Sequence, residues 1–108
     1  MPMKERRPPK APRSEPTERQ HAAEQLAIAA LGFIAAEPER LERFLALTGI
    51  APEAIRAAAR EPNFLLGVLD HVAGDEALLL AFAQHAEIEP EEVAGARDVL
   101  ARAPPEVP

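Results

Sequence analysis

Apolar residues recur at helical spacing from about residue 17 to about residue 103, and no stretch shows the alternation of a half-buried strand. Prolines and capping residues divide this region into short helices, because both favour the first turn of a helix. The capping pair Thr17 and Gln20 predicts a helix over 17–36. Further starts are predicted at Pro38 (ending before Gly49), Pro52, Pro62, Asp75 and Pro90. The pattern indicates an all-α fold, a compact bundle of five to six short helices.

The two ends of the chain fall outside this helical pattern. Residues 1–16 contain five prolines, which disfavour a helix. Residues 104–108 contain three more and stop the final helix. We therefore expect a disordered, basic, proline-rich arm over 1–16, a single all-helical domain over 17–103 and a C-terminal tail over 104–108.

An internal repeat relates the two halves of the predicted domain. A shift of 38 residues aligns Phe44 with Phe82 and the turn Ile50-Ala51-Pro52-Glu53 with Ile88-Glu89-Pro90-Glu91. The apolar positions of the first and fourth helices coincide under the same shift. We expect two three-helix units, about 24–61 and 62–99, that bury their apolar faces against each other.

Charge separates the arm from the domain. The arm carries five basic and two acidic residues, so its net charge is +3 within a chain of net charge −6. The remainder is therefore acidic. Arg6, Arg7, Lys10 and Arg13 are candidate arm contacts. The arm either keeps the chain soluble or masks the chain itself, or it docks on an acidic partner or nucleic acid.

A resemblance to a known family lies in residues 33–56, which include Arg43-Phe44-Leu45-Ala46-Leu47-Thr48-Gly49 followed by Pro52 and a helix. This segment is similar to a family of small alphaproteobacterial proteins catalogued as domain of unknown function 3572, and residues 75–82 fit the same family. The resemblance covers about residues 20–103 and leaves the arm outside. It implies an all-helical domain, and it implies no activity, cofactor or catalytic residue.

Residue types that support catalysis are scarce. The chain has no cysteine, and its hydroxyl groups are Ser14 in the arm and Thr17 and Thr48 at expected helix ends. Its five glycines are scattered and form no phosphate-binding loop. We find no catalytic, cofactor-binding or metal-binding residues, and we expect a protein that is not an enzyme and uses no cofactor.

Phe33, Phe64 and His71 form the candidate interaction patch. The first helix is apolar around most of its circumference, so it is either the central helix of the bundle or leaves part of its surface exposed. In the second case Phe33 or Phe64 would belong to a partner surface or a dimer seam. His71 aligns with Phe33 in the repeat, and it either fills a core position or acts as a ligand or pH sensor.

We interpret the chain as a non-catalytic protein–protein interaction or adaptor module of a bacterial cytoplasm, a monomer or homodimer whose partner is another protein. No secretory signal is evident, and no apolar run approaches the ~20 residues of a membrane-spanning helix. The alternative is a helix-turn-helix-like DNA-binding or regulatory protein that uses residues 44–60 and the basic arm. The negative charge makes nucleic acid the less favoured partner.

Overall fold

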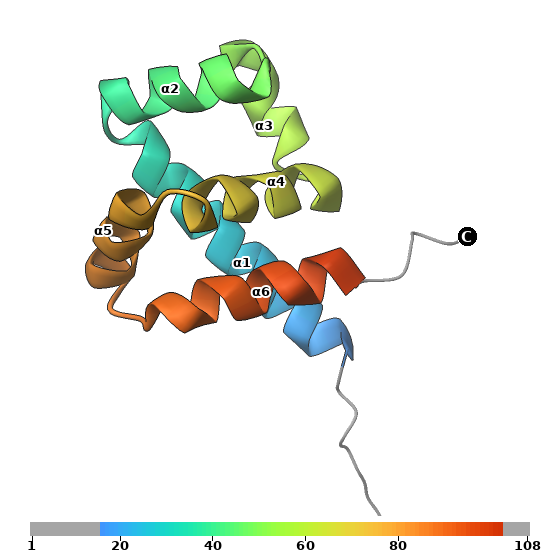
Figure 1. The fold of residues 1–108 in the computed structure, drawn as a ribbon. Helices are drawn as coiled ribbons and strands as arrows, with labels where there is room; N and C mark the ends of the chain where they lie inside the picture. Colours follow the sequence, from blue (N-terminus) through green and yellow to red (C-terminus); the bar gives the residue numbers. More distant parts are fainter. Residues whose placement is uncertain (1–15, 103–108) are drawn as a thin grey trace, which may run out of the picture.

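Six α-helices and one short 3-10 helix make up residues 16–102, the part of the chain that the computed structural model describes (Figure 1). They are α1 (Pro16–Ala35), α2 (Pro38–Thr48), η2 (Pro52–Ala54), α3 (Ile55–Ala58), α4 (Pro62–Ala73), α5 (Glu76–Ala86) and α6 (Pro90–Arg102). These residues contain no strand, so the predicted all-α fold is confirmed. The arm predicted over 1–16 lies outside the described residues except for Pro16, which already belongs to α1. The predicted tail also lies outside them.

Proline marks the first residue of most of these helices. The first N–H of a helix has no intrahelical acceptor, so proline loses no hydrogen bond at that position. The residue before a proline favours extended backbone, and Glu37 and Glu61 have this conformation, at φ −120° and −96°. Before α5 the helix start is made differently: Asp75 Oδ1 accepts a hydrogen bond from the Leu78 N–H at 3.2 Å.

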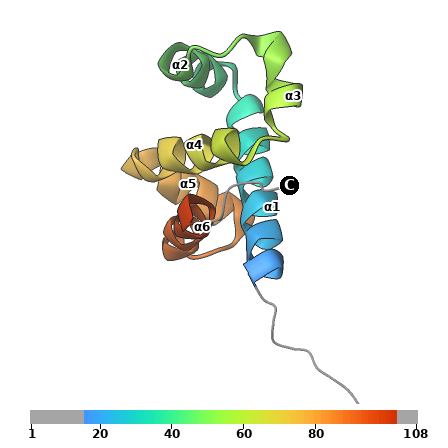
Figure 2. The same cartoon turned by 90° about the vertical axis from the view of Figure 1, so that its right-hand side faces the viewer.

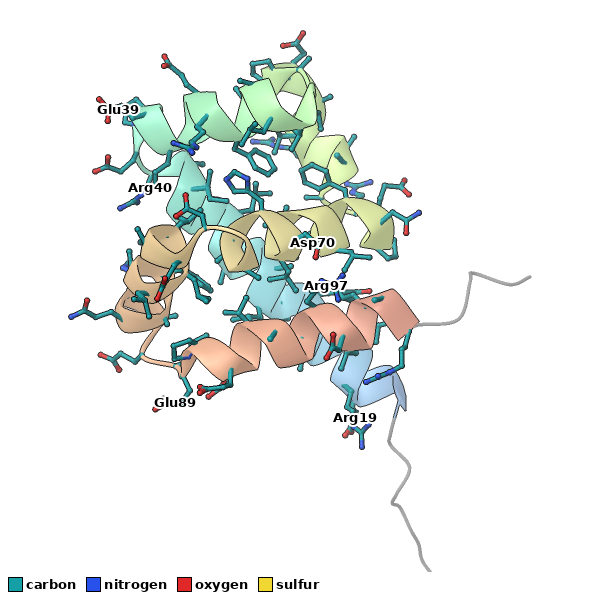
Figure 3. The ribbon with its side chains drawn as sticks, in the orientation of Figure 1. Arg19, Glu39, Arg40, Asp70, Glu89 and Arg97 are labelled. Carbon is teal, nitrogen blue, oxygen red and sulfur yellow. The ribbon has the colours of Figure 1, made fainter. Side chains whose placement is uncertain are left out.

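Helices α1, α4 and α6 enclose the main core. α1 contacts α2, α4 and α6, and Figure 2 shows it along one side of the bundle with α4 crossing it. The fully buried larger side chains are Ile34, Phe44, Val68, Leu69, Val72, Phe82 and Val93. One side of α1 stays outside this core, where Ile28 is 42% exposed. On the surface, Arg97 of α6 donates a hydrogen bond to Asp70 of α4, and their side chains face each other in Figure 3.

The first two helices of each half have matching boundaries. α1 and α4 end 38 residues apart, at Ala35 and Ala73, and α2 and α5 likewise begin and end 38 residues apart. The residue after α2 and the residue after α5, Gly49 and Glu87, both have a left-handed backbone conformation. These boundaries agree with the shift predicted from the sequence.

The third elements of the two halves differ. η2 and α3 end at Ala58, whereas α6 continues to Arg102. Pro62 stands where the second half has Leu100, a buried residue inside α6. Proline inside a helix removes a hydrogen bond and clashes with the preceding turn, so the first half cannot continue its third helix through this position. The internal repeat as a whole stays a prediction.

Candidate functional site

Phe44 joins α2 to α4 through two ring contacts. Its buried side chain lies between Phe64 and His71, with centroid distances of 6.0 Å and 5.1 Å and edge-on geometry in both pairs. Phe64 and His71 are seven residues apart on α4, so they share one face of that helix. The structure thus brings two residues of the candidate patch together, both of them half-buried around Phe44.

Phe33 belongs to a second aromatic cluster. Its ring lies 5.5 Å from that of Phe82 and 5.0 Å from that of His85, both on α5. The Arg40 guanidinium lies 4.1 Å from the Phe33 ring centroid, and its Nη1 donates a hydrogen bond to the Phe33 carbonyl at 3.3 Å. Phe33 therefore packs in a different aromatic cluster from the one that contains Phe64 and His71.

The two clusters correspond under the 38-residue shift. Phe44 aligns with Phe82, and His71 aligns with Phe33. The contact between Phe44 and His71 therefore has the contact between Phe82 and Phe33 as its counterpart. Each contact attaches the second helix of one half to the first helix of the other half.

A polar pocket of about 320 Å³ lies where α2, α5 and the end of α4 meet. Its lining residues are Glu39, Arg40, Arg43, His71, Asp75, Ala77, Leu78 and Ala81. Figure 3 labels Glu39 and Arg40 at the start of α2. Burial lowers the pKa of His71 below its ordinary value, with Asp75 opposing this shift and Arg43 adding to it. Two arginines and two carboxylates balance each other, so the pocket has no net preference for an anion or a cation.

A larger apolar groove of about 650 Å³ runs between α1 and α6 and is closed at one end by the turn after α5. We call it the α1–α6 groove. Half of its lining is alanine or glycine, and Leu26, Ile88 and Val99 supply most of the remaining apolar surface. The complete lining is Arg19, Ala22, Ala23, Gln25, Leu26, Ala29, Ala86, Ile88, Glu92, Gly95, Ala96 and Val99.

The two ends of the α1–α6 groove carry opposite charges. Glu92 lines the closed end. It belongs to a run of four exposed acidic residues between the end of α5 and the first turn of α6, which we call the acidic turn, Glu87, Glu89, Glu91 and Glu92. Glu92 also accepts a hydrogen bond from the Glu89 N–H at 3.4 Å and so helps to start α6. Arg19 lines the opposite end, and Figure 3 shows it at the start of α1, far from Glu89.

Residues 20–103 match the DUF3572 family of proteins of unknown function. The chain belongs to this family. The resemblance that the sequence suggested is therefore confirmed. Neither a curated protein nor a solved structure shows significant similarity to the chain. The DUF3572 match includes every residue that lines the α1–α6 groove except Arg19, and it leaves out the arm with Arg6, Arg7, Lys10 and Arg13, which lies outside the described residues.

The sequence of this DUF3572 domain gives little indication of the groove. Its α1 side follows helical spacing, with Ala22, Leu26 and Ala29 on one face. Alanine is so common in this chain that such a stripe does not stand out. The clearest signal in the sequence is Gly95. A glycine inside a helix lowers helix stability, so its presence there indicates a packing or functional role.

The segment weighed as a helix-turn-helix consists of the end of α2, η2 and α3. α3 has four residues and spans about 6 Å, about half the width of a DNA major groove.

Within the described part of this DUF3572 domain, no three histidine, aspartate or glutamate side chains are grouped as a metal ion would require. None of its described helices combines the length and apolar character needed to cross a bilayer.

Proposed function

We propose that this DUF3572 chain is a non-catalytic interaction module, an adaptor that binds a basic, partly apolar segment of a partner protein in the α1–α6 groove. One observation carries the proposal: an apolar groove of about 650 Å³ between two helices ends at the acidic turn. The role we propose is in a bacterial cytoplasm, for a monomer or homodimer that uses no cofactor.

The lining of the groove suits a docked segment. Alanine and glycine on both walls keep the side chains short, so a partner can approach the two helix backbones closely. Leu26, Ile88 and Val99 are only partly buried, and docking would remove their remaining apolar surface from water. Insertion of an apolar face into a groove between helices is a common way of recognising a peptide segment.

The acidic charge of the domain indicates that the partner segment also carries basic residues. Residues 16–102 contain seven arginines against fifteen aspartates and glutamates, so the body attracts basic segments. Glu92 of the acidic turn lines the closed end of the groove, and the other three acidic residues of this turn are its near neighbours in the chain. A partner with basic residues beyond its apolar stretch would pair with these exposed groups, which favours association rate and correct orientation.

The groove can be blocked at Gly95 without disturbing the fold. A Cβ built at Gly95 meets no atom within 4 Å, and the same holds at Gly67, an exposed glycine of α4 outside the groove lining. Gly95→Arg places a long cationic side chain in the groove, whereas Gly67→Arg adds the same charge and size elsewhere. Arginine is a good helix former, so neither variant should lose stability.

The test is a cross-linked pull-down with the full chain from its native host, with and without nuclease, read by mass spectrometry. We expect one protein with a basic segment to be captured by the native chain and by Gly67→Arg after nuclease treatment, and to be lost with Gly95→Arg. Capture that ignores Gly95→Arg contradicts the groove. Capture that disappears with nuclease would favour the DNA-binding alternative instead.

A further inference from the structure

We propose that the basic arm of the same chain, residues 1–15, lies along the α1–α6 groove and competes with the partner for it. This rests on the proposed function, since it names a regulator of the same docking site. The observations that lead to it are the place where the arm joins the fold, the length of the arm and the charges along the groove.

The arm joins the fold at the open end of the groove. It precedes Pro16, and the first groove residue, Arg19, is three residues further along α1. The wall from Arg19 to Ala29 spans about 15 Å of helix. Nine extended residues span about 30 Å, so Arg6 and Arg7 can reach the acidic turn while Glu15 remains next to Pro16.

The charges along the groove give the arm one preferred direction. Arg19 at the open end attracts Glu15 and repels the basic residues of the arm. The acidic turn at the closed end attracts those basic residues. The arm would therefore run antiparallel to α1, with Arg13 nearest the open end and Arg6 nearest the acidic turn.

The proline content of the arm suits a helix-lined groove. The N–H and C=O groups within α1 and α6 already pair inside those helices, so the walls offer few backbone partners to a docked chain. Pro8, Pro9 and Pro12 have no N–H to satisfy. Proline also restricts the free chain, which lowers the entropy cost of ordering it on the groove.

A tether makes even weak docking effective. A short flexible connection gives an effective concentration in the millimolar range. If the free arm peptide bound with a Kd of about 0.1 mM, the tethered arm would weaken partner binding about ten-fold. Neutralising Arg6, Arg7, Lys10 and Arg13 should therefore increase partner capture by the full chain.

The position of the arm is measurable because the chain has no cysteine. A nitroxide attached to Pro8→Cys in the full chain should broaden the amide NMR signals of Ala29, Glu92 and Gly95. The broadening should disappear when Arg6, Arg7, Lys10 and Arg13 are all changed to glutamine. Broadening that is confined to the start of α1, or that survives these four substitutions, overturns the proposal.

A synthetic peptide of residues 1–15 provides a second measurement. It is added to the chain in which Arg6, Arg7, Lys10 and Arg13 are changed to glutamine. We expect it to shift the amide signals of the groove, and we expect Gly95→Arg but not Gly67→Arg to abolish these shifts. Shifts elsewhere, or none, overturn the proposal.

The two proposals fail in different ways. Suppose that the amide signals of the groove residues stay sharp in the labelled Pro8→Cys chain, while Gly95→Arg still abolishes partner capture from lysate. The arm proposal is then wrong, and the adaptor function stands. If the label broadens the amide signals of the groove residues while partner capture is unaffected by Gly95→Arg, the arm docks in the groove, but the groove is not the docking site of the partner.

Discussion

Glu87 adopts after α5 the left-handed backbone conformation that Gly49 adopts after α2, with φ of 60° and 75°. The Gly49 N–H donates to the Leu45 carbonyl at 2.8 Å. After α5 the Ile88 N–H donates to the Ala83 carbonyl at 3.0 Å, as in a Schellman ending. The hydrogen bonds of the two turns differ, but both turns need a left-handed residue, and only the first has the residue that adopts this conformation without a steric penalty.

Replacing Glu87 with glycine should stabilise the fold. A side chain in the left-handed region costs roughly 1–2 kcal/mol, and the greater freedom of glycine in the unfolded chain offsets part of the gain. We expect Glu87→Gly to raise the free energy of unfolding by about 0.5–1 kcal/mol and Gly49→Ala to lower it by about 1 kcal/mol. Urea unfolding followed by circular dichroism measures both, and a Glu87→Gly chain that unfolds more readily than the native one would contradict the assignment of this turn.

The buried phenylalanine of each aromatic cluster should be essential for stability. Phe44 and Phe82 are 0% and 1% exposed, and truncating such a side chain leaves a cavity. We expect Phe44→Ala and Phe82→Ala each to cost about 3–5 kcal/mol. Leu47, which is 66% exposed on α2, is the control, and Leu47→Ala should change stability by less than about 0.5 kcal/mol. Similar losses for all three variants would show that the clusters do not hold α2 and α5 in place.

His71 should make the fold less stable in mild acid. Burial lowers its pKa below 6.5 in the folded chain, so the unfolded chain binds more protons between that lowered pKa and 6.5. The contribution of the neutral imidazole to the free energy of unfolding is fully present above pH 6.5. It decreases as the pH falls through 6.5, and it stops decreasing below the folded-state pKa. His71→Phe, which copies Phe33, should remove this part of the pH dependence.

Urea unfolding at several values from about pH 7.5 to about pH 5 measures the effect. The native chain and Leu47→Ala should lose stability across this range by the same amount, and His71→Phe should lose less. A His71→Phe chain that keeps the full native slope would show that other groups cause it.

Two exposed helical glycines should be replaceable with a gain in stability. Gly67 and Gly95 have free space where a Cβ would lie, and alanine is the better helix former. We expect Gly67→Ala and Gly95→Ala each to stabilise the fold by about 0.5–1 kcal/mol. Gly74 is the contrasting position, because a Cβ there would lie 3.2 Å from the Asp70 carbonyl oxygen. The midpoint temperature of thermal unfolding should be lower for Gly74→Ala than for the other two variants. The reverse order would contradict the packing described for the end of α4.

The sequence predicts the helices well because their starts depend on local chemistry. Pro38, Pro62 and Pro90 begin helices where expected, and Asp75 caps α5, since each acts within its own first turn. The α1–α6 groove depends instead on how two helices distant in the chain approach each other. Its alanine-rich walls have no signal that separates them from an ordinary core face, and Phe33 and Phe64 are the more conspicuous residues although they lie in different clusters.

Partner capture from nuclease-treated lysate, compared between Gly95→Arg and Gly67→Arg, tests the central claim most directly. Both variants carry the same new charge and side chain, and only the first places it in the α1–α6 groove. We predict that Gly67→Arg captures the partner as the native chain does, and that Gly95→Arg captures at least about ten-fold less, a loss of about 1.4 kcal/mol in binding. Equal capture by the two variants would contradict the groove as the docking site.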